Sequence, residues 1–154
     1  MRGIGGWVPV ASLLAAAAGL VGAAAPADIV ATRVAALREL GAAFKNVNDE
    51  LKSGTPQLYI IQLSARQIRD AAKAQYSWFP AGSGAQPGVK TAAKPEIWAQ
   101  SAKFTAAQDA FAAEADTFRH VAMAGDVAAI TAEAKVLGRT CASCHHVFRA
   151  ADRE

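Results

Sequence analysis

The chain of 154 residues has only two cysteines, Cys141 and Cys144. A structural zinc site would need two further ligands, and His120 and His146 are the only other candidates that we find. Alternating or β-branched runs are also missing around the cysteines, which counts against a thioredoxin-like dithiol because that motif follows a strand. A plain disulfide would explain the two cysteines but not the histidine, His145, that directly follows them.

Neither sign of charge dominates, and charged residues are scattered along the chain. Without residues 1–24, 15 basic side chains remain against 13 acidic ones, a net charge of +2. This balance gives little electrostatic basis for nucleic-acid binding. Beyond residue 24, no apolar run approaches the length of about 20 residues that a transmembrane helix needs. We therefore expect neither a nucleic-acid partner nor a stable membrane span after that point.

The first 24 residues have the pattern of a secretory signal peptide. Arg2 precedes an apolar stretch at residues 7–21, and small residues follow it. We expect cleavage after Ala24, with an uncleaved anchor as the alternative. The remaining residues, 25–154, have the length of one domain with one core.

The run Cys-Ala-Ser-Cys-His at residues 141–145 is the most informative feature that is present. A Cys-x-x-Cys-His motif is typical of covalent c-type haem attachment. The thiols of Cys141 and Cys144 would add to the two vinyl groups of the porphyrin, and His145 would supply an imidazole to the iron. The motif therefore predicts one covalent haem c per chain.

Abundant alanine and sparse strand formers favour helices. Helical spacing of apolar residues appears in four stretches, about 27–48, from Thr55-Pro56 through Ala72, from Pro95 to 124, and from 127 onward. Prolines and glycines at 77–94 predict a long connection. The expected inward residues are Val30, Val34, Leu37, Leu40, Phe44 and Val47, then Leu58, Ile61, Ala65, Ile68 and Ala72, then Ile97, Phe104, Phe111 and Phe118, and finally Val127, Ile130, Ala134, Leu137, Cys141, Cys144 and Phe148.

These stretches predict an all-α fold, an antiparallel up-down-up-down four-helix bundle with a covalently bound haem. On a helical wheel of about 100° per residue, His145 lies about 40° from Cys141 and His146 about 140° from it. We expect His145 to face the haem and His146 to face water. The antiparallel layout also places Leu37 and His145 at similar heights.

Longer motifs in the chain resemble those of the class II cytochromes c, and of cytochrome c′ in particular. Residues 29–45 are similar to the first helix of that family, 79–84 and 94–98 to its central loop and third-helix start, 124–126 to the turn before its last helix, and 137–149 to its haem segment. The resemblance covers nearly all of the chain beyond residue 24. It implies a bundle of this topology, a periplasmic location and a homodimer formed through the first two helices.

The resemblance also distinguishes two kinds of haem site. In low-spin relatives a methionine four residues after an arginine is the sixth iron ligand, whereas cytochrome c′ has an apolar residue there and five-coordinate iron. Here Leu37 stands four residues after Arg33. The only methionine beyond the leader, Met123, is expected more than about 20 Å away at the other end of the bundle, and His120 is excluded in the same way.

We therefore expect a five-coordinate haem iron that transfers single electrons, binds diatomic gases such as nitric oxide and carbon monoxide, or both. A six-coordinate low-spin electron carrier is the alternative, and it would require a ligand that the sequence does not supply. The redox partner is not identified by any motif. No nucleophile, base or substrate pocket is evident, so we do not expect an enzyme.

Weaker expectations concern the surroundings of the haem. The resemblance implies that Arg33 or Arg149 neutralises a haem propionate, with Lys94 as a further candidate, while a solvated helix charge is the alternative for each arginine. The aromatic residues Tyr76, Trp78, Phe79 and Trp98 would pack either on the haem or in the core.

Overall fold

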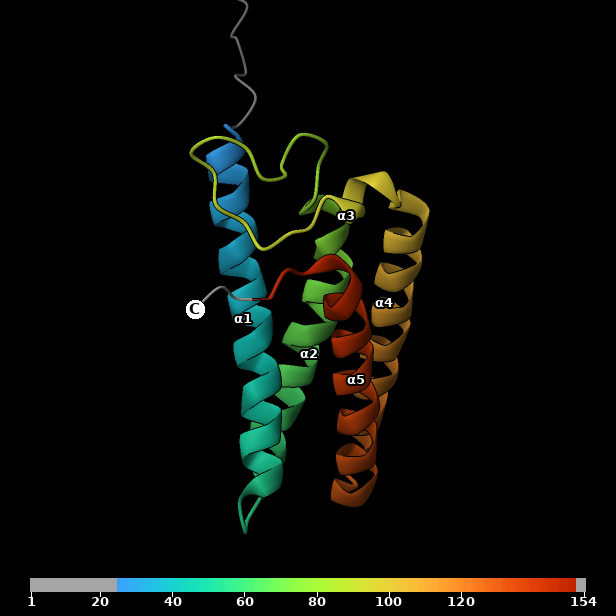
Figure 1. Ribbon diagram of the computed structural model, residues 1–154. Helices are drawn as coiled ribbons and strands as arrows, with labels where there is room; N and C mark the ends of the chain where they lie inside the picture. Colours follow the sequence, from blue (N-terminus) through green and yellow to red (C-terminus); the bar gives the residue numbers. More distant parts are fainter. Residues whose placement is uncertain (1–24, 152–154) are drawn as a thin grey trace, which may run out of the picture.

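A computed structural model describes residues 25–151, so the expected signal peptide lies outside the described residues. Its α-helices are α1 (Pro26–Lys52), α2 (Leu58–Ala74), α3 (Glu96–Ala99), α4 (Ser101–Ala124) and α5 (Val127–Phe148), and a 3-10 helix, η1, spans Gln75–Ser77. Figure 1 shows the long helices side by side. Within the described range, β structure is limited to two isolated bridges, and none of the helices there is long and apolar enough to cross a membrane.

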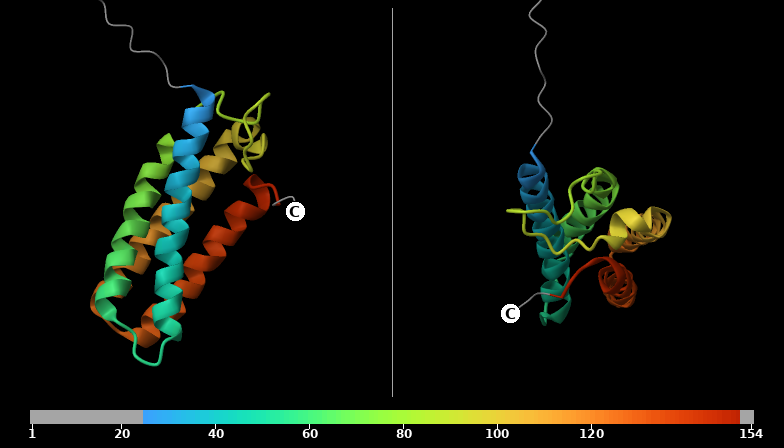
Figure 2. Two further views of the ribbon diagram at one scale, coloured as in Figure 1. Left: turned by 90° about the vertical axis from the view of Figure 1, so that its left-hand side faces the viewer. Right: turned by 45° about the horizontal axis from the view of Figure 1, so that its top comes forward.

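The four long helices form an antiparallel ring, which confirms the predicted bundle. Helix α1 packs on α2, α2 on α4, and α4 on α5. The fourth side of the ring, between α1 and α5, has far fewer contacts than the other three. In the left view of Figure 2, these two helices lie close together where α5 begins and diverge toward the end that carries the long connection.

Two helix starts differ from the predictions. The second helix begins at Leu58 rather than Pro56, because Gln57 is extended and its backbone N–H donates to the Glu50 carboxylate at 2.9 Å. The predicted third helix is divided by Gln100, whose φ of −121° and ψ of 47° end α3 and precede α4. By contrast, the turn after α4 is as predicted: Gly125 adopts a φ of +81°, and the Asp126 carboxylate accepts hydrogen bonds from two backbone N–H groups of α5.

The core is divided into two apolar clusters. The larger one, the lower cluster, joins the four long helices and contains Ala43, Val47, Ile61, Ala65, Ile68, Ala72, Phe111, Ala115, Phe118, Ala122, Ile130, Ala134 and Leu137. The smaller one, the upper cluster, contains Ile97, Phe104 and Phe148, with Phe79, Trp98 and Cys144 packed against it. The seven-residue seam predicted for the third helix is buried throughout. Leu37 is 37% exposed in the chain without haem, and its packing against the haem stays a prediction.

Candidate haem-binding site

Cys141 and Cys144 lie at the boundary between the two clusters. Both are half-buried free thiols on α5. Cys141 packs against the lower cluster, and Cys144 packs against the upper cluster. The two side chains expected to hold the haem therefore mark the place where the apolar core is interrupted.

Both thiols are neutral in this setting. Burial raises the pKa of Cys141, and the neighbouring Cys144 raises it further. Burial alone raises the pKa of Cys144. A zinc site would require thiolates together with further ligands. In the part of the chain that the structure describes, no group of three or more His, Cys, Asp and Glu residues is arranged to hold a metal ion.

Helices α1 and α5 meet at Phe44 and Gly138, and this contact fixes their register. A Cβ atom on Gly138 would lie 3.4 Å from Cζ of Phe44. His145 is seven residues after Gly138, and Leu37 is seven residues before Phe44. Seven residues are about two turns, or about 10 Å, so both side chains return to the facing sides of their helices at the same height. Leu37 on α1 is therefore at the height of His145 on α5.

His145 differs from its neighbour His146 in its surroundings, although both side chains are exposed. Partial burial of the His145 ring lowers its pKa, and the positive charge of Arg149 lowers it further. A lowered pKa keeps the imidazole neutral at neutral pH. The neutral imidazole is the form that binds iron.

The long connection between η1 and α3 crosses the upper end of the bundle, as Figure 1 shows. One part of it is bonded to α1. The buried guanidinium of Arg33 donates to the Trp78 carbonyl, to the hydroxyl and carbonyl oxygens of Ser83, and to the Thr91 hydroxyl, at 2.9 to 3.3 Å. It also lies 4.8 Å from the centre of the Phe79 ring.

The other part of the connection is bonded to the end of α5. The backbone N–H of Lys94 donates to the Phe148 carbonyl at 3.0 Å, and the N–H of Ala150 donates to the Ala92 carbonyl at 2.8 Å. The Lys94 ammonium donates to the Val147 carbonyl at 3.0 Å. All three residues expected near a propionate, Arg33, Lys94 and Arg149, therefore lie at this end of the bundle, and their pairing with a propionate stays a prediction.

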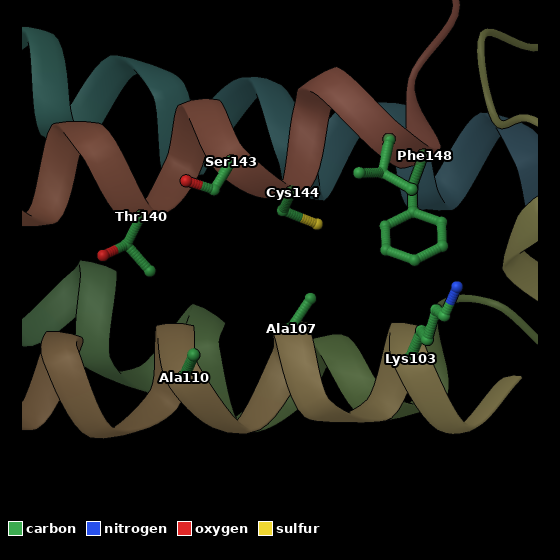
Figure 3. A pocket seen from close by; sticks show the side chains of 8 residues that line it. Lys103, Ala107, Ala110, Thr140, Ser143, Cys144 and Phe148 are labelled. Carbon is green, nitrogen blue, oxygen red and sulfur yellow. The ribbon is translucent and has the colours of Figure 1, made fainter. Parts of the chain in front are cut away.

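A pocket of about 350 Å³ opens beside Cys144 between α4 and α5. Figure 3 shows the sulfur of Cys144 directed toward it. Its lining is mainly small or apolar and consists of Lys103, Ala107, Ala110, Thr140, Ser143, Cys144, Val147 and Phe148. The thiol of Cys144 is thus accessible through this pocket, from the side of α5 that faces α4.

The four aromatic residues singled out in the sequence have different positions. Phe79 and Trp98 belong to the upper cluster, and the Trp98 indole N–H donates to the Phe79 and Pro80 carbonyls. Trp78 is half-buried, and its carbonyl accepts from Arg33. Tyr76 is exposed and donates its hydroxyl hydrogen to Asp109 at 2.7 Å, which places it in a contact between η1 and α4.

The site includes two residues that sequence reasoning missed, Ser83 and Thr91. Both accept hydrogen bonds from Arg33, 50 and 58 residues earlier in the chain. A serine and a threonine in a loop rich in glycine and proline look like ordinary turn residues. Only the burial of Ser83, which is fully shielded from solvent, reveals its role.

The residues present fit a covalently attached haem. The apolar core is interrupted at two half-buried thiols, and an imidazole with a lowered pKa follows them on the same helix. These are the groups that c-type attachment requires. Phe104 supplies an apolar wall through edge-to-face contacts with Phe79 and Phe148, at 5.0 and 5.1 Å between ring centres.

Comparison with known proteins agrees with this geometry. The family model described as cytochrome C′ matches residues 28–149. Cytochrome c′ of Rhodopseudomonas palustris is 36% identical over 131 residues, covering 83% of this chain and 86% of that one. Cytochrome c′ of Rubrivivax gelatinosus is 40% identical over a shorter match of 68 residues, covering 44% of this chain and 53% of that one.

Solved structures show the same fold. The crystal structure of the Rubrivivax gelatinosus cytochrome c′ superposes with a TM-score of 0.73 at 28% identity, covering 80% of this chain and 96% of that one. A cytochrome c′ described for its ligand-controlled dimer dissociation superposes with a TM-score of 0.79 at 23% identity, covering 84% of this chain and all of the other. With its bundle, its haem motif and this match over most of its length, the chain belongs to the cytochrome c′ family and is a haem c protein.

Proposed function

We propose that this protein is a periplasmic cytochrome whose haem iron is five-coordinate at rest and which transfers single electrons, binds diatomic gases such as nitric oxide and carbon monoxide, or does both. The observation that carries the proposal is the position of Leu37 at the height of His145. A leucine side chain has no donor atom for iron. At this height, α1 therefore offers bulk but no sixth ligand.

In this proposal, Cys141 and Cys144 hold the haem through thioether bonds, and His145 is the ligand on one side. Haem c bound there would supply a redox-active iron with one open coordination position. Leu37 would stand in front of that position and would have to move for a gas to enter. Because Leu37 donates no hydrogen bond, it would favour nitric oxide and carbon monoxide over dioxygen, whose bound form gains from a distal donor.

The six-coordinate alternative needs a ligand that can reach the space opposite His145. Met123 lies at the end of α4, where its sulfur accepts a hydrogen bond from Arg66 at 3.5 Å. Helix α5 begins beside this end, and 17 residues at about 1.5 Å each separate its first residue from Cys144. His120 is about one turn before the end of the same helix. Met123 is therefore more than about 20 Å from the site, and His120 is at nearly that distance.

The cellular setting is inferred from the leader and from the family. The signal-peptide pattern of residues 1–24 supports export, and a periplasmic location agrees with membership of this family. A solved cytochrome c′ from Alcaligenes xylosoxidans, a leucine-to-alanine variant, is a nitric oxide complex. That structure supports gas binding as the proposed role here. We propose no enzymatic activity.

We further propose a homodimer through α1 and α2. Tyr59 and Leu63 are 71% and 41% exposed, and together with Gln67 and Asp70 they form one stripe of α2 at helical spacing. A notch of about 450 Å³ adjoins this stripe and is lined by Glu39, Leu40, Ala42, Ala43, Asn46, Gln67 and Asp70. An exposed tyrosine and leucine beside a notch are suited to pack against the same face of a second copy.

Optical spectra of the purified protein, oxidised and reduced, test the proposed function. We expect high-spin spectra in both states at neutral pH, without the charge-transfer band of methionine–iron ligation. Acid–acetone extraction should leave the haem on the protein, and the variant with both Cys141→Ser and Cys144→Ser should lose it. Low-spin spectra in both oxidation states would replace this proposal with the six-coordinate carrier.

A further inference from the structure

The connection between η1 and α3 bridges the side of the bundle where the helices contact each other least. Its early part is bonded to Arg33 on α1, and its last part is bonded to the end of α5 near Phe148. Helices α1 and α5 themselves have few contacts and diverge toward this end. The connection is therefore a physical link between two helices that packing alone leaves loosely joined.

Arg33 is buried and makes four hydrogen bonds to this connection. Its side chain is 2% exposed although it lies on an outer helix of a small bundle. Both terminal nitrogens are used: Nη1 donates to Trp78 and Ser83, and Nη2 donates to Ser83 and Thr91. The guanidinium is a rigid planar fork, so it can hold several acceptors at fixed positions, which a lysine ammonium on a flexible stem cannot do.

The same guanidinium also reaches the apolar wall of the site. It lies over the ring of Phe79, which packs edge to face on Phe104, and Phe104 packs on Phe148 at the end of α5. Arg33 thus contacts the connection through hydrogen bonds and the upper cluster through a cation–π contact. Leu37 is one turn further along α1 on the same side.

We propose that Arg33 is a positioning residue that ties α1 to α5 through residues 78–94, and that this tie limits how far Leu37 can move away from the space opposite His145. Releasing the tie frees the first half of α1 to swing outward. Only the effect on Leu37 rests on the proposed function, because the tie itself is a property of the connection and the two helices.

The competing role for Arg33 is direct charge pairing with a haem propionate. Charge and hydrogen-bond geometry are separated by two substitutions. Arg33→Lys keeps the positive charge but loses the fork, and Arg33→Gln loses both. If the tie is the function, the lysine variant behaves like the glutamine variant; if charge pairing is the function, it behaves like the unchanged protein.

Hydrogen–deuterium exchange of the haem-loaded protein tests the tie directly. In Arg33→Lys and Arg33→Gln, we expect the backbone N–H groups of Ser83, Lys94 and Ala150 to exchange about tenfold faster or more, since hydrogen bonds to charged groups are among the stronger ones. Ser83→Ala and Thr91→Val each remove one acceptor and should give a smaller increase. Ser77→Ala and Thr117→Val remove hydroxyls that donate to backbone carbonyls three and four residues earlier in the chain, and they should leave exchange unchanged.

Carbon monoxide association with the ferrous protein tests the effect on Leu37. We expect association to become several-fold faster in Arg33→Lys and Arg33→Gln and to rise in Ser83→Ala and Thr91→Val. If the wild-type iron proves six-coordinate, the proposed function fails, while the exchange data still decide whether the tie exists. The tie would be overturned if exchange is unchanged in all four variants, or if Arg33→Lys exchanges like the wild type while Arg33→Gln exchanges faster. Faster exchange with unchanged carbon monoxide rates would show that the tie exists but does not limit the movement of Leu37.

Discussion

Leu37 and His145 lie at the same height on facing helices, each two turns from the contact between Phe44 and Gly138. The position of the leucine is therefore set at two places, by the approach of α1 to α5 at Gly138 and by the connection over the other end. Between these places the helices make few contacts. Leu37 thus lies on the least constrained side of the bundle.

Substitutions at Gly138 should change the spacing of α1 and α5 without touching the haem residues. Gly138→Ala adds a Cβ at 3.4 Å from Phe44, an ordinary contact, and raises helix propensity, so we expect the free energy of unfolding to rise by about 0.5–1 kcal/mol. Gly138→Leu should push the helices apart, lower stability and speed carbon monoxide association. Urea unfolding and stopped-flow kinetics measure both effects. Gly41→Leu, with nothing within 4 Å, is the control, and equal rates in the two leucine variants would contradict the expected spacing effect.

Leu37 should act as a steric barrier. Leu37→Ala should speed carbon monoxide association with the ferrous protein, at a stability cost within about 2–5 kcal/mol when haem covers the site. Leu37→Met keeps nearly the same volume but presents a thioether, and should drive the iron toward six-coordination. Stopped-flow rates and optical spectra decide both outcomes. Leu63→Ala removes a leucine of similar exposure on α2 and should change neither the carbon monoxide rates nor the spectra. If the two Leu37 variants also leave rates and spectra unchanged, another side of α1 faces the iron.

Stability should fall as the pH rises through neutrality because of Glu114. Burial raises the pKa of this carboxyl from 4.5 to about 7, and the neighbouring Glu133 adds to the shift while Arg139 opposes it. Because the folded chain binds this proton more tightly than the unfolded chain, the stabilising contribution is complete below pH 4.5 and is lost as pH rises through about 7.

Glu114→Gln mimics the protonated form and should remove this part of the pH dependence. We expect it to raise the free energy of unfolding at about pH 8 by about 1 kcal/mol or less, since solvent screens a carboxyl that is only half-buried. Urea unfolding at about pH 5 and about pH 8 measures the change. Asp28→Asn, at an exposed carboxyl in the first turn of α1, should keep the wild-type slope, and an unchanged slope in Glu114→Gln would exclude this carboxyl as its source.

Charged substitutions on the exposed stripe of α2 should dissociate the proposed dimer. Tyr59→Glu combined with Leu63→Glu would bury like charges against their own copies across a twofold interface. We expect sedimentation equilibrium to report a monomer with an unchanged optical spectrum. Val127→Glu alters an exposed apolar residue in the first turn of α5 and should leave the assembly intact. A dimer that survives the double variant would place the interface on other helices.

Local sequence signals predicted most of the bundle. Gly125 and Asp126 marked a helix end and a helix start, and the spacing of Phe104, Phe111 and Phe118 marked a buried seam. These features depend on residues within one or two turns. The break at Gln100 and the delayed start at Leu58 were missed because no motif marks them. Gln100 leaves the helical conformation between two helical segments, and Gln57 is held in an extended conformation by the side chain of Glu50.

The candidate site was predicted where covalent chemistry requires a motif and was missed where contacts are distant. Covalent attachment of one haem requires two cysteines and a histidine at a fixed short spacing. The sequence therefore shows Cys141, Cys144 and His145 as one recognisable motif. The partners of Arg33 lie 45 to 58 residues away, and no local pattern connects them. A helix arginine is normally solvated, so its burial beneath a loop had no signal in the sequence.

The division of the core has a consequence for the chain before haem is attached. The lower cluster joins all four long helices, whereas the upper cluster is built around three buried residues. Regions with few buried apolar contacts open at a lower free energy than the rest of a protein. The newly made chain should therefore keep its lower half folded while the upper end opens and closes, which exposes Cys144 more often than Cys141 until the bound cofactor completes the interior.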